Sequence, residues 1–265
     1  MGARLKDKVA IVTGGGKGIG KAISKAFLSE GAAVVIAARN LPKLEEAVKE
    51  FEAMGGRTMA IQTDITDEKQ VARMAAETVK AFGKIDILVN NSGNPGPTCN
   101  VMDLKLEDWN QVLAVDLTGS MLCAREVLKY MVPRETGNII NIAAEGGRTG
   151  DGRSGYPMRS PYCCAKMGVI GLTETLAQEV GKYKIRVNTI SAGAVRGDRF
   201  NRVNEARAKA QGIPFDEAVK KTMAKYSLGR PVEEYELANC AVFVASDEAS
   251  AVTGQILVCS CGYHI

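Results

Sequence analysis

Short apolar runs rich in β-branched residues recur along the chain and alternate with longer segments in which apolar residues follow helical spacing. Runs of this length, bounded by glycine or polar residues, predict strands. Their almost continuous apolar character predicts strands that are buried on both faces, as in a parallel sheet. The seven predicted strands are 8–14, 32–38, 57–64, 85–91, 137–144, 185–192 and 255–260. The predicted helices lie near 18–30, 40–54, 67–82, 107–132, 160–181, 202–226 and 233–246.

This alternation of strands and helices indicates an α/β fold, because right-handed crossovers between parallel strands place helices on both faces of the sheet. We expect one domain over residues 1–265, since no linker interrupts the chain. Two segments are irregular, 145–160 and 191–218. Both follow the carboxyl ends of strands, where open α/β sheets bind their ligands.

Composition and charge exclude several classes of protein. The chain has 46% apolar and 24% charged residues, and its net charge of +4 is spread without a basic run, which argues against nucleic-acid binding.

No signal pattern and no apolar run of about 18 residues appear, so we expect a cytoplasmic protein without a membrane span. The seven cysteines lack paired spacing, and we expect thiols. His264 is the only histidine, which leaves too few imidazoles for a histidine-based triad or a His-rich metal site, and we expect no metal.

The first predicted strand runs into a glycine-rich turn, "TGGGKGIG", at the start of a predicted helix. Glycines allow the backbone to approach a pyrophosphate, and the exposed N–H groups of a helix start favour its negative charge. The pattern therefore predicts a dinucleotide site, with a plain strand-to-helix turn as the alternative. The predicted cofactor-binding residues of this turn are Gly14, Gly16, Lys17, Gly18, Ile19 and Gly20.

The second predicted strand ends without the acidic residue that binds the ribose 2′-hydroxyl of NAD about 20 positions after the glycines. Ala38 stands there and Arg39 follows. A carboxylate would repel a 2′-phosphate, whereas a guanidinium binds it through charge-assisted hydrogen bonds. Together with Lys17, Arg39 predicts NADP(H) as the cofactor, although either residue alone is also what a solvated surface charge looks like.

Tyr162 and Lys166 are four residues apart in a predicted helix, so their side chains share one helix face. A tyrosine has an ordinary pKa near 10 and needs about 4 kcal/mol of help to act as an acid or base at neutral pH. A cation about 4 Å away, at an effective dielectric constant of about 20, supplies about this much. The pair predicts acid-base catalysis, and a chance pair on a helix surface is the alternative.

With "TGGGKGIG", "NNSG" at 90–93 and "YCCAK" at 162–166 in this order, the chain resembles the classical short-chain dehydrogenase/reductase family over residues 8–262. The resemblance implies a doubly wound Rossmann-fold domain with a seven-stranded parallel sheet and a homotetramer. In that family the tyrosine exchanges a proton with the substrate oxygen, while the lysine lowers the tyrosine pKa and binds the nicotinamide ribose. These roles carry over to Tyr162 and Lys166.

The same resemblance implies further contacts to the cofactor. Asp64 matches the residue that borders the adenine, Asn90 the one that lines the cofactor cleft, and Val195 the backbone contact to the carboxamide. Residues beside these positions complete the predicted cofactor-binding set: Asn40, Ile65, Asn91, Ser92, Gly93 and Gly193.

Three positions depart from the family pattern. Ala144 stands where the family has a serine that donates a hydrogen bond to the reacting oxygen, and loss of such a donor typically costs about 2.7–4 kcal/mol in the transition state. Alanine is also what a deliberate inactivating substitution would leave. Asp116 replaces an asparagine, and close to Lys166 it would partly cancel the cation on which the tyrosine depends. Ala192 replaces a proline, which predicts only a looser turn.

Replacements for the missing serine donor are a serine or glutamate in the following loop, or a group of the substrate itself. Strand alternation points Glu145 away from the Ala144 side. Ser154 and Ser160 are the other candidates in the chain.

Arginines are concentrated in the two irregular segments. An anionic substrate such as a carboxylate, sulfonate or phosphate ester would explain them. Solvated loop arginines or tetramer contacts explain them equally well. The segment 196–218 is expected to close over the substrate and exclude water. The arginines concerned are Arg148, Arg153, Arg159, Arg196, Arg199 and Arg202.

These observations predict an NADP(H)-dependent oxidoreductase that interconverts a secondary alcohol or aldehyde and its carbonyl, with a small-molecule substrate. The catalytic positions are Tyr162, Lys166, Asp116 and Ala144. A cofactor-binding protein with decayed catalysis and a regulatory or structural role is the main alternative, favoured by Ala144 and Asp116. A dehydratase or epimerase on the same scaffold is a third, and it would convert substrate without net change in the nicotinamide.

Overall fold

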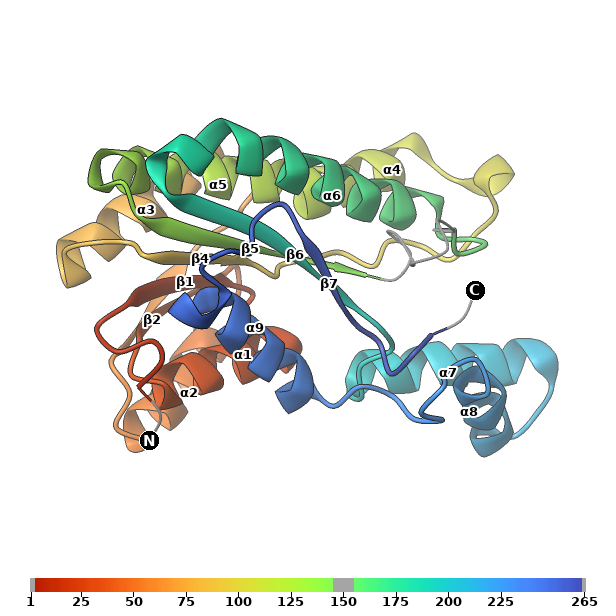
Figure 1. Cartoon of the computed structure of the whole chain (residues 1–265). Coiled ribbons are helices and arrows are strands. Elements are labelled where there is room, and N and C mark those ends of the chain that lie inside the picture. Colours follow the sequence, from red (N-terminus) through yellow and green to blue (C-terminus); the bar gives the residue numbers. More distant parts are fainter. Residues whose placement is uncertain (1–2, 145–154, 264–265) are drawn as a thin grey trace.

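The computed structural model describes residues 3–144 and 155–263, and within them the strands form one sheet (Figure 1). All neighbouring strands are parallel, and the strand order is β3-β2-β1-β4-β5-β6-β7. The predicted seven-stranded parallel sheet is thus confirmed. The strands are β1 (Val9–Thr13), β2 (Ala33–Ala38), β3 (Thr58–Gln62), β4 (Ile87–Asn90), β5 (Gly137–Ala144), β6 (Ile185–Ala192) and β7 (Ile256–Cys259).

Helices cover both faces of the sheet, as the crossover rule requires (Figure 1). One face carries α3 (Glu68–Phe82), α5 (Gly119–Met131) and α6 (Ser160–Val180), with α4 (Leu106–Leu113) against α6. The other carries α1 (Gly18–Ser29), α2 (Leu41–Ala53) and α9 (Glu234–Ala245). Short 3₁₀ turns lie at Val101–Asp103, Val132–Arg134, Gly181–Tyr183 and Asp247–Ala249.

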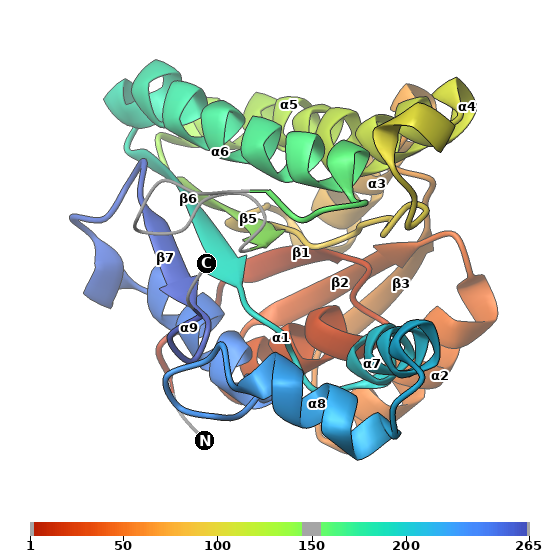
Figure 2. The same cartoon turned by 90° about the vertical axis from the view of Figure 1, so that its right-hand side faces the viewer.

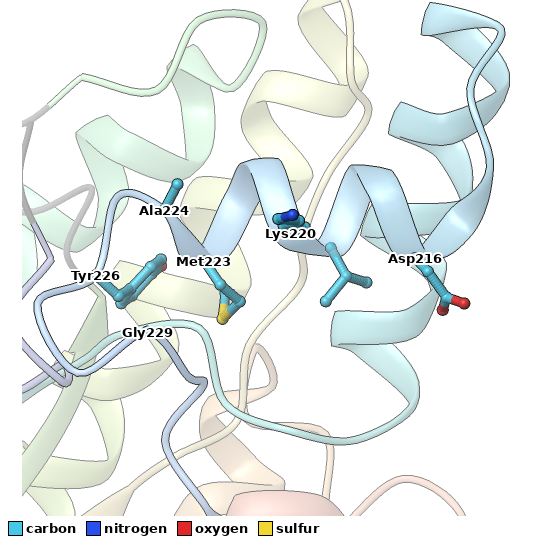
Figure 3. A pocket seen from close by; sticks show the side chains of 7 residues that line it. Asp216, Lys220, Met223, Ala224, Tyr226 and Gly229 are labelled. Carbon is cyan, nitrogen blue, oxygen red and sulfur yellow. The ribbon is translucent and has the colours of Figure 1, made fainter.

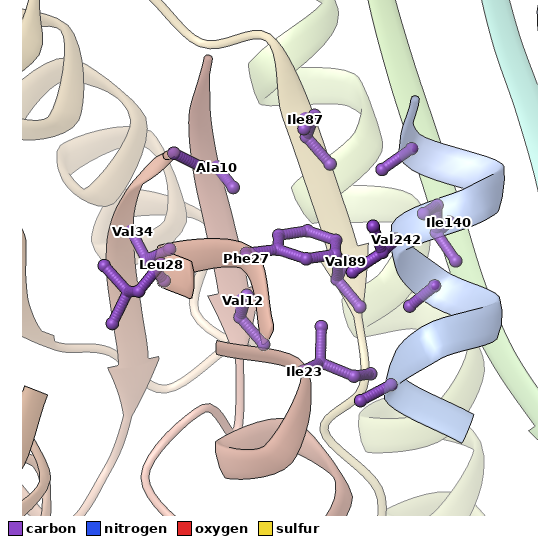
Figure 4. Packing of buried hydrophobic residues seen from close by; sticks show 14 of the residues in the cluster. Ala10, Val12, Ile23, Phe27, Leu28, Val34, Ile87, Val89, Ile140 and Val242 are labelled. Atoms are coloured by element: carbon purple, nitrogen blue, oxygen red, sulfur yellow. The ribbon is translucent and has the colours of Figure 1, made fainter. Parts of the chain in front are cut away.

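The central strands are buried on both faces because successive side chains point to opposite sides. Val12 packs with Phe27 of α1 and Val242 of α9, whereas its neighbour Ile11 packs on the opposite side with Met74 of α3. Figure 4 shows Phe27 among the apolar side chains of the first of these two layers. Burial of a side chain of this size stabilises the fold by about 1.5–3 kcal/mol.

A buried carboxylate, Asp86, lies at the amino ends of the strands, on the side of the sheet away from the carboxyl ends where a ligand is expected. Asp86 accepts hydrogen bonds from the Val9 N–H and from Arg134, each at 2.8 Å, and pairs with Lys84 at 2.9 Å. Burial alone would raise the pKa of Asp86, but its cationic and N–H partners outweigh burial and leave the pKa lowered. The charged carboxylate therefore contributes to stability at neutral pH.

The region after β6 differs from the sequence prediction of a single helix over 202–226. Two helices form instead, α7 (Asp198–Gln211) and α8 (Phe215–Met223), and the first begins inside the segment predicted to be irregular. Gly212 separates them in a left-handed conformation with φ +61°, and Pro214 lacks the N–H needed to continue a helix. Figure 2 shows the α7 and α8 pair beyond the carboxyl ends of the strands.

A second difference concerns the predicted helix 107–132. It is divided into α4 and α5 by a π-helical turn, Ala114–Thr118, which contains the fully buried Asp116. A π-helical turn accommodates one extra residue and so widens the helix locally. Such turns are common at functional sites.

Candidate active site

Tyr162 and Lys166 lie on one buried face of α6, with exposed fractions of 7% and 6%. Pro161 occupies the first turn of the helix, where its missing N–H is not needed. The Lys166 Nζ lies 5.8 Å from the centroid of the Tyr162 ring and donates a hydrogen bond to the Ile142 carbonyl at 3.0 Å. Because β5 supplies that acceptor, the sheet itself holds the ammonium group next to the tyrosine.

The π-helical turn brings Asp116 to the other side of Lys166. Its Oδ2 lies 3.5 Å from Nζ, and its Oδ1 accepts a hydrogen bond from the Asn94 N–H. Burial raises the pKa of Asp116, and the attraction of Lys166 offsets only part of this effect. The Asp116 carboxylate is therefore close enough to Lys166 to cancel part of the positive charge on which the tyrosine depends.

Ala144, at the carboxyl end of β5, packs in a small apolar cluster with Tyr162, Val112 and Ala165. The position of the family serine is therefore next to the tyrosine but carries no donor. Ser160 does not replace it, because residues two apart on a helix do not share a face, and its buried Oγ has no hydrogen-bond partner among the described residues. Glu145, Arg148, Arg153 and Ser154 lie outside the described residues.

Two of the predicted arginines meet at the tyrosine. The guanidinium carbons of Arg159 and Arg199 lie 4.8 Å and 5.1 Å from the centroid of the Tyr162 ring. Burial lowers the pKa of Arg159, with a further contribution from Arg199. Arg196 is directed elsewhere, since it pairs with Glu233 at 2.7 Å, and Arg202 is exposed on α7.

The glycine turn has the geometry of a backbone cradle. Gly14 and Gly18 adopt φ of +67° and +51°, which favour glycine. A Cβ on Gly20 would lie 2.5 Å from the Asn91 Nδ2 and collide with the Gly14 carbonyl. Lys17 precedes α1 without a side-chain cap, so the N–H groups of this helix start stay available for an anion. These residues fit a bound pyrophosphate.

The carboxyl end of β4 holds this turn in place. Asn91 donates from Nδ2 to the Thr13 carbonyl at 2.9 Å, and the N–H groups of Asn91 and Ser92 donate to the Thr13 hydroxyl. Gly93 lies against Asp116, since a Cβ there would be 3.3 Å from its carboxylate. Asn90 is buried, and its Nδ2 donates to the Ser120 carbonyl and the Asn141 Oδ1, while its place beside the cofactor stays a prediction.

The opposite end of the predicted cofactor site lies beside α2. Gly16 packs against Leu44, and Arg39 is exposed with no ion pair among the described residues. Asn40 caps α2 by accepting from the Lys43 N–H at 3.1 Å. The glycine turn and Arg39 therefore both lie near the start of α2.

The remaining predicted cofactor contacts follow β3 and β6. Asp64 accepts from the N–H and the hydroxyl of Thr66, while Ile65 is buried against the turn that begins α5. After β6, Gly193 donates from its N–H to the Cys259 carbonyl at 2.9 Å. Val195 pairs with Val232 in an isolated parallel bridge.

A hollow of about 540 Å³ lies beside α8, lined by Lys220, Met223 and Tyr226 (Figure 3). A second, of about 430 Å³, lies at the amino ends of the strands beside Asp86. Neither hollow is lined by Tyr162 or Lys166, so neither is the site that these two residues form.

Metal ligands and membrane spans are both missing from the described residues. No group of three or more His, Cys, Asp or Glu side chains within 3–144 and 155–263 is arranged to hold a metal ion. Over the same ranges no helix is both long and apolar enough to cross a membrane.

Known proteins match the chain over nearly its whole length. A family model described as enoyl-(acyl carrier protein) reductase matches residues 14–264. A 3-oxoacyl-(acyl-carrier-protein) reductase of Thermotoga maritima is 33% identical over 96% of both chains. The chain belongs to the classical short-chain dehydrogenase/reductase family, as the sequence motifs indicated.

Solved structures agree with this assignment. An actinorhodin polyketide ketoreductase variant with NADPH superposes with a TM-score of 0.91 and 31% identity over 100% of both chains. A xylitol dehydrogenase bound to NAD⁺ gives a TM-score of 0.91 and 30% identity over 98% of this chain and 100% of its own. The fold is a Rossmann fold, and these relatives support a general oxidoreductase role with a nicotinamide cofactor.

Proposed function

We propose that the chain is an NADP(H)-dependent oxidoreductase that interconverts an alcohol and its aldehyde or ketone by hydride transfer. The observation that carries the proposal is the buried pair on α6, in which the Lys166 ammonium is held by the Ile142 carbonyl beside the Tyr162 ring. When bound, the nicotinamide supplies or accepts the hydride.

In the reducing direction the Tyr162 hydroxyl gives its proton to the substrate oxygen, and Lys166 stabilises the tyrosinate that remains. In the oxidising direction the tyrosinate takes the proton of the alcohol. Proton transfer by a positioned side chain contributes about 10²–10⁴-fold to a rate. The apolar walls formed by Ala144 and Val112 exclude water from the tyrosine and so strengthen the field of the lysine.

NADP(H) rather than NAD(H) is supported by the exposed Arg39 at the end of β2, which has no ion pair among the described residues, by Lys17 in the glycine turn, and by the absence of an acid at position 38. Hydrogen bonds to charged groups contribute about 1.5–3 kcal/mol each. We therefore expect Arg39→Ala to weaken NADPH binding about 10- to 100-fold while NADH binding stays unchanged. Equal losses for both cofactors would contradict the assignment.

The second candidate is an NADP(H)-binding protein without catalysis, which Ala144 and Asp116 favour. The two are separated by following nicotinamide absorbance with NADPH and NADP⁺ against a panel of carbonyls and alcohols, with Tyr162→Phe as the control. Turnover that disappears in the control supports the enzyme. Tight NADPH binding with no turnover across the panel supports the non-catalytic protein. The homotetramer, the single domain and the cytoplasmic location stay predictions from the sequence.

A further inference from the structure

The side chains of two arginines lie over the ring of Tyr162. The guanidinium carbons of Arg159 and Arg199 are 4.8 Å and 5.1 Å from its centroid. The two cations therefore lie within about one Debye length of each other in 0.1 M salt, about 10 Å. Arg159 belongs to the start of α6 and Arg199 to α7, so two segments far apart in the sequence bring like charges to one ring.

Among the described residues, Arg159 and Arg199 have no ion-pair partner of opposite charge. Neither forms an ion pair within the part of the chain that the structure describes, whereas the nearby Arg196 pairs with Glu233. The charge of Arg199 acts on Asp116, but the Oδ2 of this carboxylate is already 3.5 Å from the Lys166 Nζ. Among these residues Tyr162 is surrounded by three cations and one anion.

An unused donor lies beside the same ring. Among the described residues, the Arg159 Nε is buried without an acceptor. Arg159 precedes α6 without a side-chain cap, at the end of the helix where the dipole is positive. Buried donors are nearly always satisfied in a functional state, and an oxyanion would satisfy this one.

We propose that Arg159 and Arg199 bind an anionic group of the substrate, so that the chain acts on short oxo or hydroxy compounds that carry a carboxylate, sulfonate or phosphate. This inference rests on the proposed function of Tyr162. Because both guanidiniums lie over the ring of the reacting tyrosine, the anionic group is only a few bonds from the reacting carbon. The bound anion also links α7 to α6 and so holds α7 over the site.

The test compares matched carbonyl compounds with NADPH. The two-carbon set is glycolaldehyde, glyoxylate, sulfoacetaldehyde and glycolaldehyde phosphate, and the ketone set is hydroxyacetone, acetoacetate, sulfoacetone and dihydroxyacetone phosphate. We expect one anionic class to exceed its neutral counterpart about 100-fold or more in kcat/KM, since charge-assisted hydrogen bonds from two arginines add. The class preferred distinguishes carboxylate, sulfonate and phosphate.

Arg159→Met and Arg199→Met are each expected to lower kcat/KM for that anion at least about 10-fold more than kcat/KM for its neutral counterpart. Arg202→Met, at another exposed arginine of the same helix as Arg199, is the matched control and should have no effect. Arg199 is itself exposed, so its variant tests the proposal even where Arg159→Met fails to fold. Anions no better than neutral compounds, or an equal loss in Arg202→Met, would overturn the proposal.

Ligand-observed NMR with acetate, methanesulfonate and methylphosphonate on the NADP⁺-loaded protein separates this inference from the proposed function. Arginine-dependent binding of one of these ions without turnover of any compound would remove the proposed function but keep the anion site. Turnover of neutral compounds with no arginine-dependent binding would remove the anion site and keep the proposed function.

Discussion

Asp116→Asn changes the balance of charge at the reacting tyrosine without changing the shape of the side chain. At 3.5 Å and an effective dielectric constant of about 20, the attraction between Asp116 and Lys166 is about 5 kcal/mol. The burial of the carboxylate opposes it, and the raised pKa of Asp116 shows that burial is the larger of the two effects. The charged aspartate therefore destabilises the fold.

The raised pKa of Asp116 also determines how the stability of the fold changes with pH. Asp116 has a higher pKa in the folded than in the unfolded chain, so the folded state binds more protons and loses stability as the pH rises through that pKa. We expect Asp116→Asn to be at least as stable as wild type at pH 7 and to match it below the ordinary aspartate pKa. Urea unfolding at both pH values measures this. A loss of about 3–5 kcal/mol at pH 7, typical of a broken buried pair, would refute it.

The same substitution changes catalysis. Lys166 Nζ is 5.8 Å from the Tyr162 centroid and Asp116 Oδ2 is 3.5 Å from Nζ, so the carboxylate is at most about 9 Å from the ring. The charge of a tyrosinate lies on its phenolate oxygen, about 3 Å beyond the centroid, so its repulsion by the carboxylate is at least about 1.4 kcal/mol at an effective dielectric constant of about 20.

Removing this repulsion should move the pH midpoint of alcohol oxidation down by about one unit, since 1.36 kcal/mol corresponds to one unit. The midpoint is read from the pH profile of kcat with a compound that the wild type turns over. The exposed Asp103→Asn carries the same charge change and should leave the midpoint in place. An unmoved or raised midpoint in Asp116→Asn would show that the carboxylate does not act on Tyr162.

Three further predictions concern the donor, the cradle and the base of the sheet. Ala144→Ser places a hydroxyl beside Tyr162 and should raise kcat about 10²–10³-fold; an unchanged kcat would mean that another group already supplies the donor. Gly20→Ala should reduce NADPH affinity in a fluorescence titration by more than 10-fold, because the added Cβ would lie 2.5 Å from the Asn91 amide. Gly171→Ala, an α6 position with open space, should leave affinity unchanged. Asp86→Asn should lower the free energy of unfolding by about 1–3 kcal/mol at pH 7. That difference should disappear as the pH falls through the lowered pKa of Asp86, and its persistence in acid would contradict the ion-pair explanation.

The sheet and its helices were predictable because the signals are local. Each strand reads as an apolar run and each crossover helix as a periodic segment, and the crossover rule then places helices on both faces of the sheet. Two predicted helices are divided in the structure, and each division has a local cause. Gly212 and Pro214 divide the predicted helix 202–226, although the helical spacing on both sides of them continues across the break. The π-helical turn around Asp116 leaves no signal in the spacing of apolar residues.

At the site, the Tyr162 and Lys166 pair was predictable because an i, i+4 spacing fixes proximity within one helix. The approach of Asp116 to Lys166 depends on how α4 packs against α6, and only the structure gives its 3.5 Å separation. The inward turn of Asn90 depends likewise on partners 30 and 51 residues away in the sequence. The sequence marks Arg159 and Arg199 as candidates, but nothing in their spacing places them over the same ring.

The charged side chains around Tyr162 act on the tyrosine in opposite directions. Ala144 provides no donor to the reacting oxygen, and the negative charge of Asp116 offsets part of the positive potential that Lys166 places at Tyr162. Arg159 and Arg199 act in the opposite direction, because both add positive potential at the ring. A substrate anion on these arginines would cancel that potential as it binds, leaving Lys166 and Asp116 to set the balance.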